Sequence, residues 1–310
     1  MVGPCPPGRA AAGFSSQSIV MGERLFLRLH DDPLHGPESG VPDGTLQVLP
    51  IAPALRSHVS HLLMYRETFA PGHEVRERVL PDGAIRLVFN FGDAPSADDA
   101  PGQAVEAIGA FAAPAVVRMR DTVEGLSVAL RPGAAAALLG VPAGEIAGRA
   151  VHLDELWGGE GTTLLARMAE ARGDAARAQL LQQALMKRLQ KAGDGTPPAA
   201  AMHAARLIAA ADGRQALREV AQAVGVGERR LQQLFHAHVG LSPRAWGRLA
   251  RLHACLRALR LHSAPAWADM ALDHGFYDQS HLVNEFRALC GVTPTEFLGR
   301  RVSVSSKTAR

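Results

Sequence analysis

The sequence predicts an α+β fold, with a β-rich N-terminal domain that ends in helices and an all-α C-terminal domain. The chain of 310 residues suffices for two domains of ordinary size, each burying its own core. Short apolar runs separated by Pro, Gly and Asp fill the first half, which is typical of strands. In the last third a pattern of about thirty residues occurs twice, about fifty residues apart, and its apolar spacing is helical.

Residues 1–44 are rich in Gly and Pro and lack a clear periodicity, so we expect a disordered tail, with Met21 as an alternative start to Met1. The beginning of the chain lacks the basic start and apolar block of a secretory signal. No run of ~18 apolar residues could span a membrane. We therefore expect a cytoplasmic protein. Its three cysteines lie far apart and are expected as free thiols: Cys5, Cys255 and Cys290.

Residues 45–192 form the predicted N-terminal domain. Its expected strands are the apolar runs at 45–50, 61–69, 84–93, 105–111, 115–120 and 124–133. The pattern then becomes helical, at 134–140, 152–158, 161–173 and 174–193. Residues 193–198, GDGTPP, form the expected interdomain linker.

Several polar residues lie within or beside these strands. Facing inward, they would line a pocket for a small molecule. Facing outward, they would be the solvent side of alternating strands, and we favour this second orientation. The residues are Arg86, Asn90, Arg118, Arg120 and Arg131.

The C-terminal third contains an internal repeat, in which residues 217–246 align with residues 267–297. The offset between matched residues changes from 50 to 51 within the repeat. The inserted residue falls in a turn, where a chain tolerates insertion, so the repeat is structural. Matched pairs are Gly225 and Gly275, Leu231 and Leu282, Phe235 and Phe286, and Pro243 and Pro294.

Each copy predicts a helix, a tight turn and a second helix. In the first copy Val220 and Val224 lie at helical spacing, and Gly225 supplies the left-handed conformation that ends a helix. Leu231 and Phe235 then belong to the apolar stripe of the second helix. This arrangement is the helix-turn-helix unit. A hydroxyl cap and a proline open a further helix in each copy, at Ser242–Pro243 and Thr293–Pro294.

A long helix joins the two units. It opens at Pro243 and continues for roughly 19 residues, or ~28 Å, until residues 263–265 break it. A rigid helix of this length could hold the two second helices about one DNA turn, ~34 Å, apart. One chain would then engage two successive segments of the major groove.

The face opposite the apolar stripe is polar in both second helices. Gln and Asn pair in a bidentate way with adenine, and Arg pairs with guanine, so these side chains suit a reader of the major groove. A plain solvated face is the better explanation for one such helix alone, but two copies in one basic segment favour the reader. The residues are Arg229, Gln232 and Gln233 in the first copy, and Gln279, Ser280 and Asn284 in the second.

The charge is unevenly distributed along the chain. From residue 201 to the end there are 15 Lys and Arg against 8 Asp and Glu, a net charge of +7, whereas residues 1–200 carry −4. A basic C-terminal third favours a polyanionic partner. An ordinary solvated surface rich in arginine explains the charge alone equally well.

These features resemble the DNA-binding domain of AraC/XylS-type bacterial transcription regulators. The resemblance rests on two motifs, GFYDQSH at 275–281 and F-R-x-x-x-G-V-T-P-x-x-F at 286–297. Both lie within a predicted domain at 199–302, and we expect a disordered tail at 303–310 after it. It implies base reading by the six polar residues named above. Many members carry Arg or Lys at the positions of Gln233 and Asn284, so no target sequence follows. We expect phosphate contacts from Arg230, Arg244, Arg248, His281 and Arg287.

The N-terminal part resembles a domain often joined to such DNA-binding domains. The similar segments are 81–93, 131–142 and 153–158. The resemblance implies a sensor-like regulatory module, without indicating its ligand. The fold class is thus an α+β chain, with a β-rich sensor-like domain followed by two helix-turn-helix units joined by a long linker helix.

Three functions stay open. The leading one is a transcription regulator whose N-terminal domain binds a ligand or dimerises, and the second is a DNA-binding adaptor whose N-terminal domain binds a protein. An enzyme with a helical accessory domain is disfavoured, because His73 and Asp82 have no nucleophile motif beside them and the common catalytic motifs are missing. Double-stranded DNA is the expected partner, at the nucleoid, without a cofactor. A small-molecule effector, RNA polymerase and a second copy of the chain are further candidate partners.

Three potential metal ligands, His274, Asp278 and His281, lie within eight positions. Gly275 separates the first from the other two, so they do not share one helical face. Asp278 is better placed as the cap of the following helix. We therefore expect no metal site.

Overall fold

The computed structural model describes residues 19–29, 32, 34–97, 100–193, 199–261 and 265–299. The expected tail at 303–310, residues 1–18 of the expected N-terminal tail, and residues 194–198 of the expected linker lie outside the described residues. Within them, the strands from Ile19 to Leu130 precede the α-helices, and the short strand Ala150–His152 lies between the helices Ala135–Leu139 and Leu153–Trp157, which agrees with the predicted fold class. None of the described helices combines the length and apolar character that crossing a bilayer needs.

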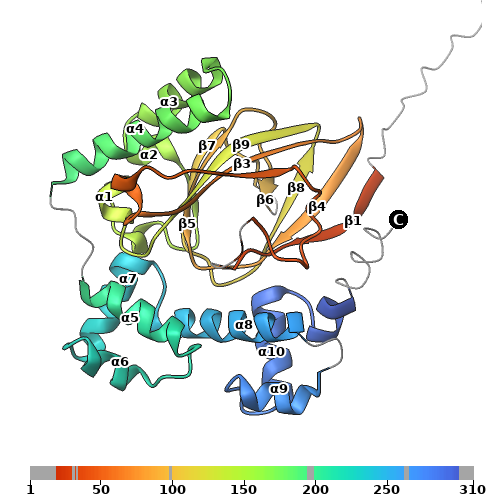
Figure 1. The fold of residues 1–310 in the computed structure, drawn as a ribbon, viewed down its shortest axis with the longest axis vertical. Coiled ribbons are helices and arrows are strands. Elements are labelled where there is room, and N and C mark those ends of the chain that lie inside the picture. The colour runs from red at the N-terminus through yellow and green to blue at the C-terminus, as the bar shows by residue number, and fades with distance from the viewer. Residues whose placement is uncertain are drawn as a thin grey trace, which may run out of the picture.

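Two sheets face each other in the N-terminal domain (Figure 1). One has the order β1–β4–β8–β6, and the other has the order β10–β7–β5–β9–β3–β2. All strand pairs are antiparallel except β1 with β4. The bounds are β1 Ile19–Phe26, β2 Leu46–Leu49, β3 Val59–Thr68, β4 His73–Val79, β5 Ile85–Asn90, β6 Ser96–Ala97, β7 Val105–Ile108, β8 Ala115–Arg120, β9 Thr122–Leu130 and β10 Ala150–His152.

Strand β1 corrects the expectation of a disordered tail at 1–44. Residues 19–26 pair in parallel with β4, with Phe26 opposite Val79. Leu25, Leu27 and Leu29 are buried in the main core. These alternating leucines give the segment an apolar face that the sheet can bury, and this outweighs the Gly- and Pro-rich sequence around them.

Alternation along the six-stranded sheet separates two faces. Leu87 and Phe89 of β5 and Leu126 of β9 point to one side and are fully buried, where Phe89 approaches Trp157 with ring centroids 6.5 Å apart. The residues between them, such as Val88, point to the other side, toward the smaller sheet. The first face forms the core with the helices, and the second is free to line a cavity.

Helices cover the outer face of the six-stranded sheet, as Figure 1 shows. They follow the strands in the chain at the positions expected from the sequence. Glycines end the first two in left-handed conformation, and His152 caps the second. The bounds are α1 Ala135–Leu139, α2 Leu153–Trp157, α3 Glu160–Glu170 and α4 Asp174–Ala192, with short 3-10 turns η1 at Pro53–Leu55 and η2 at Ala143–Glu145.

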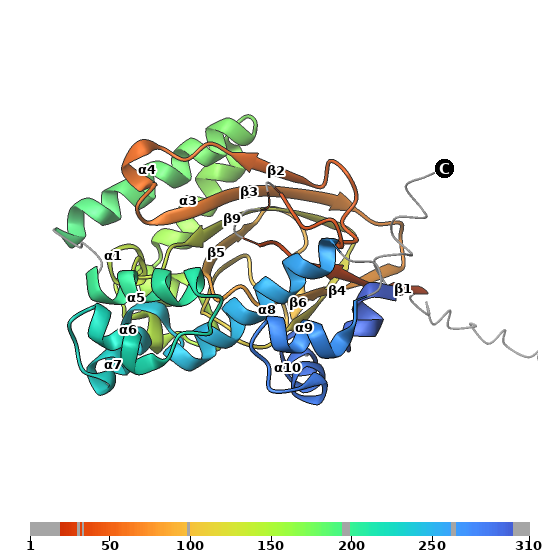
Figure 2. The ribbon, with the colours of Figure 1, turned by 60° about the horizontal axis from the view of Figure 1, so that its bottom comes forward.

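The C-terminal domain is entirely helical over its described residues. The long helix α8 runs beneath the two sheets and joins the two helical units, as Figures 1 and 2 show. It has the 19 residues that the sequence predicts. The bounds are α5 Ala199–Ala210, α6 Leu217–Ala223, α7 Glu228–Val239, α8 Pro243–Leu261, α9 Trp267–Asp273 and α10 Gln279–Cys290.

The N-terminal domain packs directly on α8. Nη1 and Nη2 of Arg260 donate to the Asp32 carboxylate at 2.7 and 2.9 Å, and Nη2 also reaches Glu38 at 3.3 Å. Both carboxylates are buried. A second contact is at Gly83, where a Cβ would lie 2.8 Å from the ring of Trp246. The buried ion pairs of Arg260 and the close packing at Gly83 hold α8 in a defined position against the sheets.

Candidate nucleic-acid interface and internal cavity

The first helix-turn-helix unit consists of α6, a short turn and α7. Gly225 in the turn has a φ of 71°, which is the left-handed conformation that the sequence predicts. Leu231 and Phe235 of α7 are fully buried, and Leu234 is nearly so. Gly240 ends α7 in left-handed conformation. The apolar stripe therefore fixes the rotation of α7 about its axis, and with it the direction of the polar face.

The polar face of α7 lies in solvent. Arg229, Gln232 and Gln233, the predicted base-reading residues, are all exposed, as are Arg230 and His236. These side chains have no hydrogen bond or ion pair to another described residue. The face is thus available to an external partner.

The second unit repeats this geometry with α9 and α10. Gly275 has a φ of 72°. Asp278 caps α10, because its carboxylate accepts a hydrogen bond from the backbone N–H of His281 at 2.7 Å. His274 instead ends α9. The cap prediction for Asp278 is confirmed, and the described residues contain no group of three or more His, Cys, Asp or Glu side chains suited to a metal ion.

The exposed face of α10 carries Gln279, Ser280 and Asn284, which are the other three predicted base-reading residues. Leu282 and Phe286 point the other way and are fully buried. Phe286 packs edge-on against Phe297, with ring centroids 5.5 Å apart. The structure thus places three predicted residues on an exposed face of each second helix.

The predicted phosphate-binding residues differ in their surroundings. Arg230, Arg244 and Arg287 are exposed. Arg248 is half-buried, and its Nε donates to Glu285 of α10 at 2.6 Å. His281 is engaged within its own unit, because its Nδ1 accepts the Tyr277 N–H at 3.1 Å and its ring packs edge-on against Phe276. The side chains of the three exposed arginines have no hydrogen bond or ion pair to another described residue, whereas Arg248 and His281 have internal contacts.

The N-terminal domain contains a cavity of about 390 Å³ between its two sheets. A cavity of this size suits a small organic molecule. Its wall is mainly apolar and includes Phe26, Leu63, Val88, Ile108, Phe111, Val117 and Met119.

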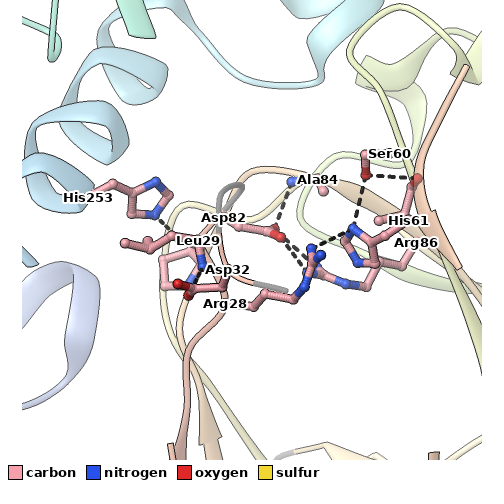
Figure 3. A network of polar contacts seen from close by, with 11 residues as sticks. Arg28, Leu29, Asp32, Ser60, His61, Asp82, Ala84, Arg86 and His253 are labelled. Carbon is pink, nitrogen blue, oxygen red and sulfur yellow. Dashed lines mark hydrogen bonds and ion pairs between the residues drawn. The ribbon is translucent and has the colours of Figure 1, made fainter. Parts of the chain in front are cut away.

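One end of the cavity is charged, as Figure 3 shows. Nη1 of Arg28 contacts Nδ1 of His61 at 2.8 Å. Arg86 forms two hydrogen bonds with Asp82, at 3.1 and 2.5 Å. Burial raises the pKa of the Asp82 carboxyl, but the Arg86 guanidinium outweighs this and holds the pKa below its usual value. Burial, together with Arg28 and Arg86, lowers the pKa of His61 to about 3, so its imidazole is neutral.

A carboxyl and a phenol lie farther along the same sheet. Burial raises the pKa of Glu106 to about 7. Burial also raises the pKa of Tyr65, whose hydroxyl donates a hydrogen bond to Asn90. The Asn90 amide in turn donates to the carbonyl of Gln103 at 2.7 Å. This part of the wall offers one carboxyl that has no hydrogen bond or ion pair to any described residue.

The five polar strand residues divide between the two orientations. Arg86 lines the cavity and Asn90 is buried beside it, so the favoured outward orientation is wrong for both. Arg120 and Arg131 are exposed, and Arg118 alternates with the cavity residues Val117 and Met119, so these three face outward. Arg28, His61 and Glu106 also line the cavity but are not among the residues expected from the sequence. His61 and Glu106 alternate with apolar residues in β3 and β7, which is the available signal.

Comparison with known families gives two matches. Residues 220–300 match the family described as "Helix-turn-helix domain". Residues 47–152 match the family described as "Domain of unknown function (DUF6597)". No curated protein matches the chain.

Among solved structures, the chain is similar to a transcriptional regulator with an AraC-type DNA-binding domain from Chromobacterium violaceum. The two are 25% identical over 33% of this chain and 91% of that one, and the TM-score is 0.31. It is also similar to ToxT from Vibrio cholerae, at 10% identity over 83% of this chain and 98% of ToxT, with a TM-score of 0.40. Wild-type ToxT from Vibrio cholerae strain SCE256 with bound unsaturated fatty acid matches at 10% identity, over 76% of this chain and 94% of that one, with a TM-score of 0.39.

Proposed function

We propose that this chain, a DNA-binding transcription regulator with an AraC-type helix-turn-helix domain, reads two successive segments of the major groove through α7 and α10. The observation that supports this most strongly is the pair of exposed polar faces, each behind a buried helix-turn-helix core and both attached to one long helix. A chain of this kind acts where the chromosome lies, so we place it in the cytoplasm, associated with the nucleoid. On this proposal it binds DNA and an effector, and catalyses no reaction.

Base recognition is assigned to the exposed polar residues of the two second helices. On α7 these are Arg229, Gln232 and Gln233, and on α10 they are Gln279, Ser280 and Asn284. Arg can pair with guanine, and Gln and Asn can pair with adenine, through two hydrogen bonds each. No internal partner has to be displaced before these side chains contact DNA, apart from water.

Phosphate contacts are assigned first to Arg230, Arg244 and Arg287, which are exposed. Arg248 and His281 are second-rank candidates, because contacting a phosphate would compete with Glu285 for Arg248 and with the turn for His281. Lysine and arginine contacts to phosphates release bound cations, so they make affinity dependent on salt.

We further propose that the cavity between the sheets binds a small-molecule effector and that the loop 81–83 transmits its presence to α8. Asp82 pairs with Arg86 in the cavity wall. On either side of it, the Pro81 carbonyl accepts a hydrogen bond from Nε2 of His253 at 3.0 Å, and Gly83 packs on Trp246. A ligand that moves Asp82 or Arg86 therefore shifts a loop that α8 contacts on both sides. Because α8 joins the two reading helices, such a shift changes how well they fit one duplex.

A salt titration of duplex binding by the full chain tests the DNA-binding role. For three phosphate contacts, affinity is expected to fall about 40-fold between ~50 and ~200 mM salt. The triple variant Arg230→Gln, Arg244→Gln, Arg287→Gln is expected to bind more weakly and to show a shallower salt dependence. No duplex binding by the full chain at low salt would contradict the proposal.

A further inference from the structure

We propose that the cavity between the sheets takes a small apolar molecule with a single negative charge, and that Arg28 is its counter-charge. This rests on the effector role of the cavity proposed above and adds the chemical class of the ligand. The supporting observation is a guanidinium in the cavity wall that forms no ion pair with any described carboxylate, because Asp82 and Asp32 are bonded to other groups.

Arg28 has an unusual environment for a partly buried arginine. Within the described part of the chain, its one side-chain hydrogen bond is the 2.8 Å contact of Nη1 with His61. Its Nε is buried without a hydrogen-bond partner. Burial, and then the nearby guanidinium of Arg86, lower the pKa of Arg28. Asp82 and Asp32 offset part of this effect electrostatically, but neither forms an ion pair with Arg28. A desolvated guanidinium without an ion pair is costly, so this end of the cavity favours an anion.

The two described carboxylates that act on Arg28 electrostatically already have other partners. Asp82 is held by both Nη atoms of Arg86 and by the N–H of Ala84 at 2.9 Å. Asp32 is held by Arg260 and by the N–H of Leu29 at 2.8 Å. Figure 3 shows Arg28 beside Asp82 and Asp32, but bonded to His61 alone.

The imidazole of His61 does not supply the missing negative charge. Its Nδ1 faces the Arg28 guanidinium and therefore accepts the hydrogen bond as a neutral ring. Arg86 adds a second positive charge to the same end, where Asp82 neutralises only one. Among Arg28, Arg86, His61 and Asp82 alone, one positive charge is left over, whereas Asp32 and Glu38 behind them share the single cation Arg260.

The other charged groups of the wall do not provide a comparable contact for an anion, so the contact is assigned to Arg28. Arg24 is enclosed by Glu67 and Glu77, with its Nε and Nη2 each 2.6 Å from a carboxylate oxygen. That cluster satisfies its guanidinium and leaves no free donor of strength comparable to Arg28. Glu106 is the remaining carboxyl, and its pKa of about 7 means that it is protonated in a large fraction of molecules near neutral pH. Glu106 therefore provides a weaker charge contact for a cationic ligand than Arg28 provides for an anionic one.

Apolar side chains surround the charged end. Phe26 and Ile108 belong to opposite sheets, and Val88 lies between Glu106 and Ser127 in the register. A ligand with an apolar body can bury that body against these side chains while its charge meets Arg28. A highly polar ligand, such as a sugar phosphate, would leave most of its hydroxyl groups without partners.

Thermal unfolding of the full chain with matched probes tests the ligand class. Hexanoate and phenylacetate are compared with their uncharged amides, hexanamide and phenylacetamide, and with the cations hexylamine and phenethylamine. We expect the two acids to raise the melting temperature and the amides and amines to have little effect, because a ligand that binds the folded state alone stabilises it. Stabilisation by the amines, or equal stabilisation by the acids and their amides, would overturn the assignment of charge.

Variants then locate the charge contact. Arg28→Met is expected to weaken binding of the stabilising acid at least tenfold, and Arg28→Lys to restore part of it. Arg76→Met, which removes an exposed arginine from the outer face of β4, is the matched control and should bind the acid normally. Glu106→Gln should also retain acid binding; loss of binding in this variant but not in Arg28→Met would place the ligand's polar group at Glu106 instead.

The same preparations are assayed for duplex binding without probe, so that two kinds of failure are distinguished. If the duplex is bound but neither acid stabilises the chain, the anion proposal is wrong and the DNA-binding role stands. If Arg28→Met melts like the wild-type chain yet no longer responds to acid, the loss belongs to the site and not to folding. If the duplex is not bound at low salt, the proposed function itself fails.

Discussion

Asp278 and Gln279 are neighbours in the sequence and have different roles. Asp278 accepts the N–H of His281 and fixes where α10 begins, whereas Gln279 is the first residue of that helix and is exposed. The same contrast distinguishes Arg248, which is bonded to Glu285, from the exposed Arg244 one turn earlier. At the scale of single residues, the side chains that face solvent without a partner are the ones available to DNA.

Gln279→Ala tests base reading directly. If Gln279 makes a bidentate contact with adenine, its loss should reduce discrimination between the preferred duplex and one with that base pair changed, by ~1–3 kcal/mol. The measurement is the ratio of affinities for the two duplexes at one salt concentration. An equal loss of affinity for both duplexes would show that Gln279 has no role in reading bases. Arg229→Ala is expected to act in the same way on the site of α7.

Glu106→Gln is expected to change the pH dependence of stability. The folded-state pKa of about 7 lies above the usual 4.5, so the folded state holds its proton more tightly than the unfolded state. The free energy of unfolding of the wild-type chain therefore falls by up to about 3 kcal/mol as pH rises from ~4.5 to ~7. The glutamine variant has no proton to lose at this position, so it does not show this fall. Urea unfolding at about pH 5 and about pH 8 should show the variant gaining stability relative to wild type.

The control for this experiment is Glu170→Gln, which changes an exposed carboxylate at the end of α3. Its difference from wild type should be the same at both pH values. If Glu106→Gln behaves like this control, the carboxyl of Glu106 is not held in an environment that disfavours its charge.

At the scale of elements, the C-terminal helices could be predicted from the sequence because their signals are local. Each signal is contained within a single helical unit. In the first unit these are Gly225 and the buried stripe at Leu231 and Phe235, and in the second they are Gly275 and the cap at Asp278. Strand β4, HEVRERV, was missed because charged residues occupy both of its faces. Glu77 points inward to Arg24, while Glu74 on the outer face is buried by Arg120. Such pairings between distant strands cannot be inferred from spacing along the chain.

Phe286→Ala should unfold the second helical unit. Phe286 is fully buried and packs against Phe297, so truncation leaves a cavity that costs ~3–5 kcal/mol. We expect a lower melting temperature and a loss of binding to every duplex, in contrast to Gln279→Ala. An exposed control on the same helix, Arg287→Ala, should leave the melting temperature nearly unchanged. Wild-type stability in the Phe286 variant would mean that the described packing is wrong.

In the whole molecule, α8 connects the parts, because it contacts both helical units and the N-terminal domain. The cavity could not be predicted, because its charged end combines Arg28, His61 and Arg86 from three strands or their flanks, which only the tertiary fold brings together. For this reason the sequence indicates that a small-molecule pocket is possible but does not indicate which charged residues line it. The expected division into two domains, by contrast, rests on local signals, namely the Gly- and Pro-containing linker at 193–198 and the repeat that follows it.

Arg260→Met should weaken the attachment of the N-terminal domain to α8. Asp32 and Glu38 are buried, and removing their common cation leaves two buried carboxylates unpaired, at a cost of ~3–5 kcal/mol. Urea unfolding of the full chain measures this loss. Arg244→Met, at the exposed start of the same helix, is the control and should change stability by less than about 0.5 kcal/mol. Equal stability of the two variants would argue against a tight contact at Asp32.

The central claim is that α7 and α10 read one duplex together. Selection of bound sequences from a random duplex library with the full chain tests it most directly. The account predicts two blocks of preferred bases whose centres lie about one helical turn, ~10.5 base pairs, apart, with Arg229→Ala relaxing one block and Gln279→Ala the other. A single block, or two variants that relax the same block, would contradict it.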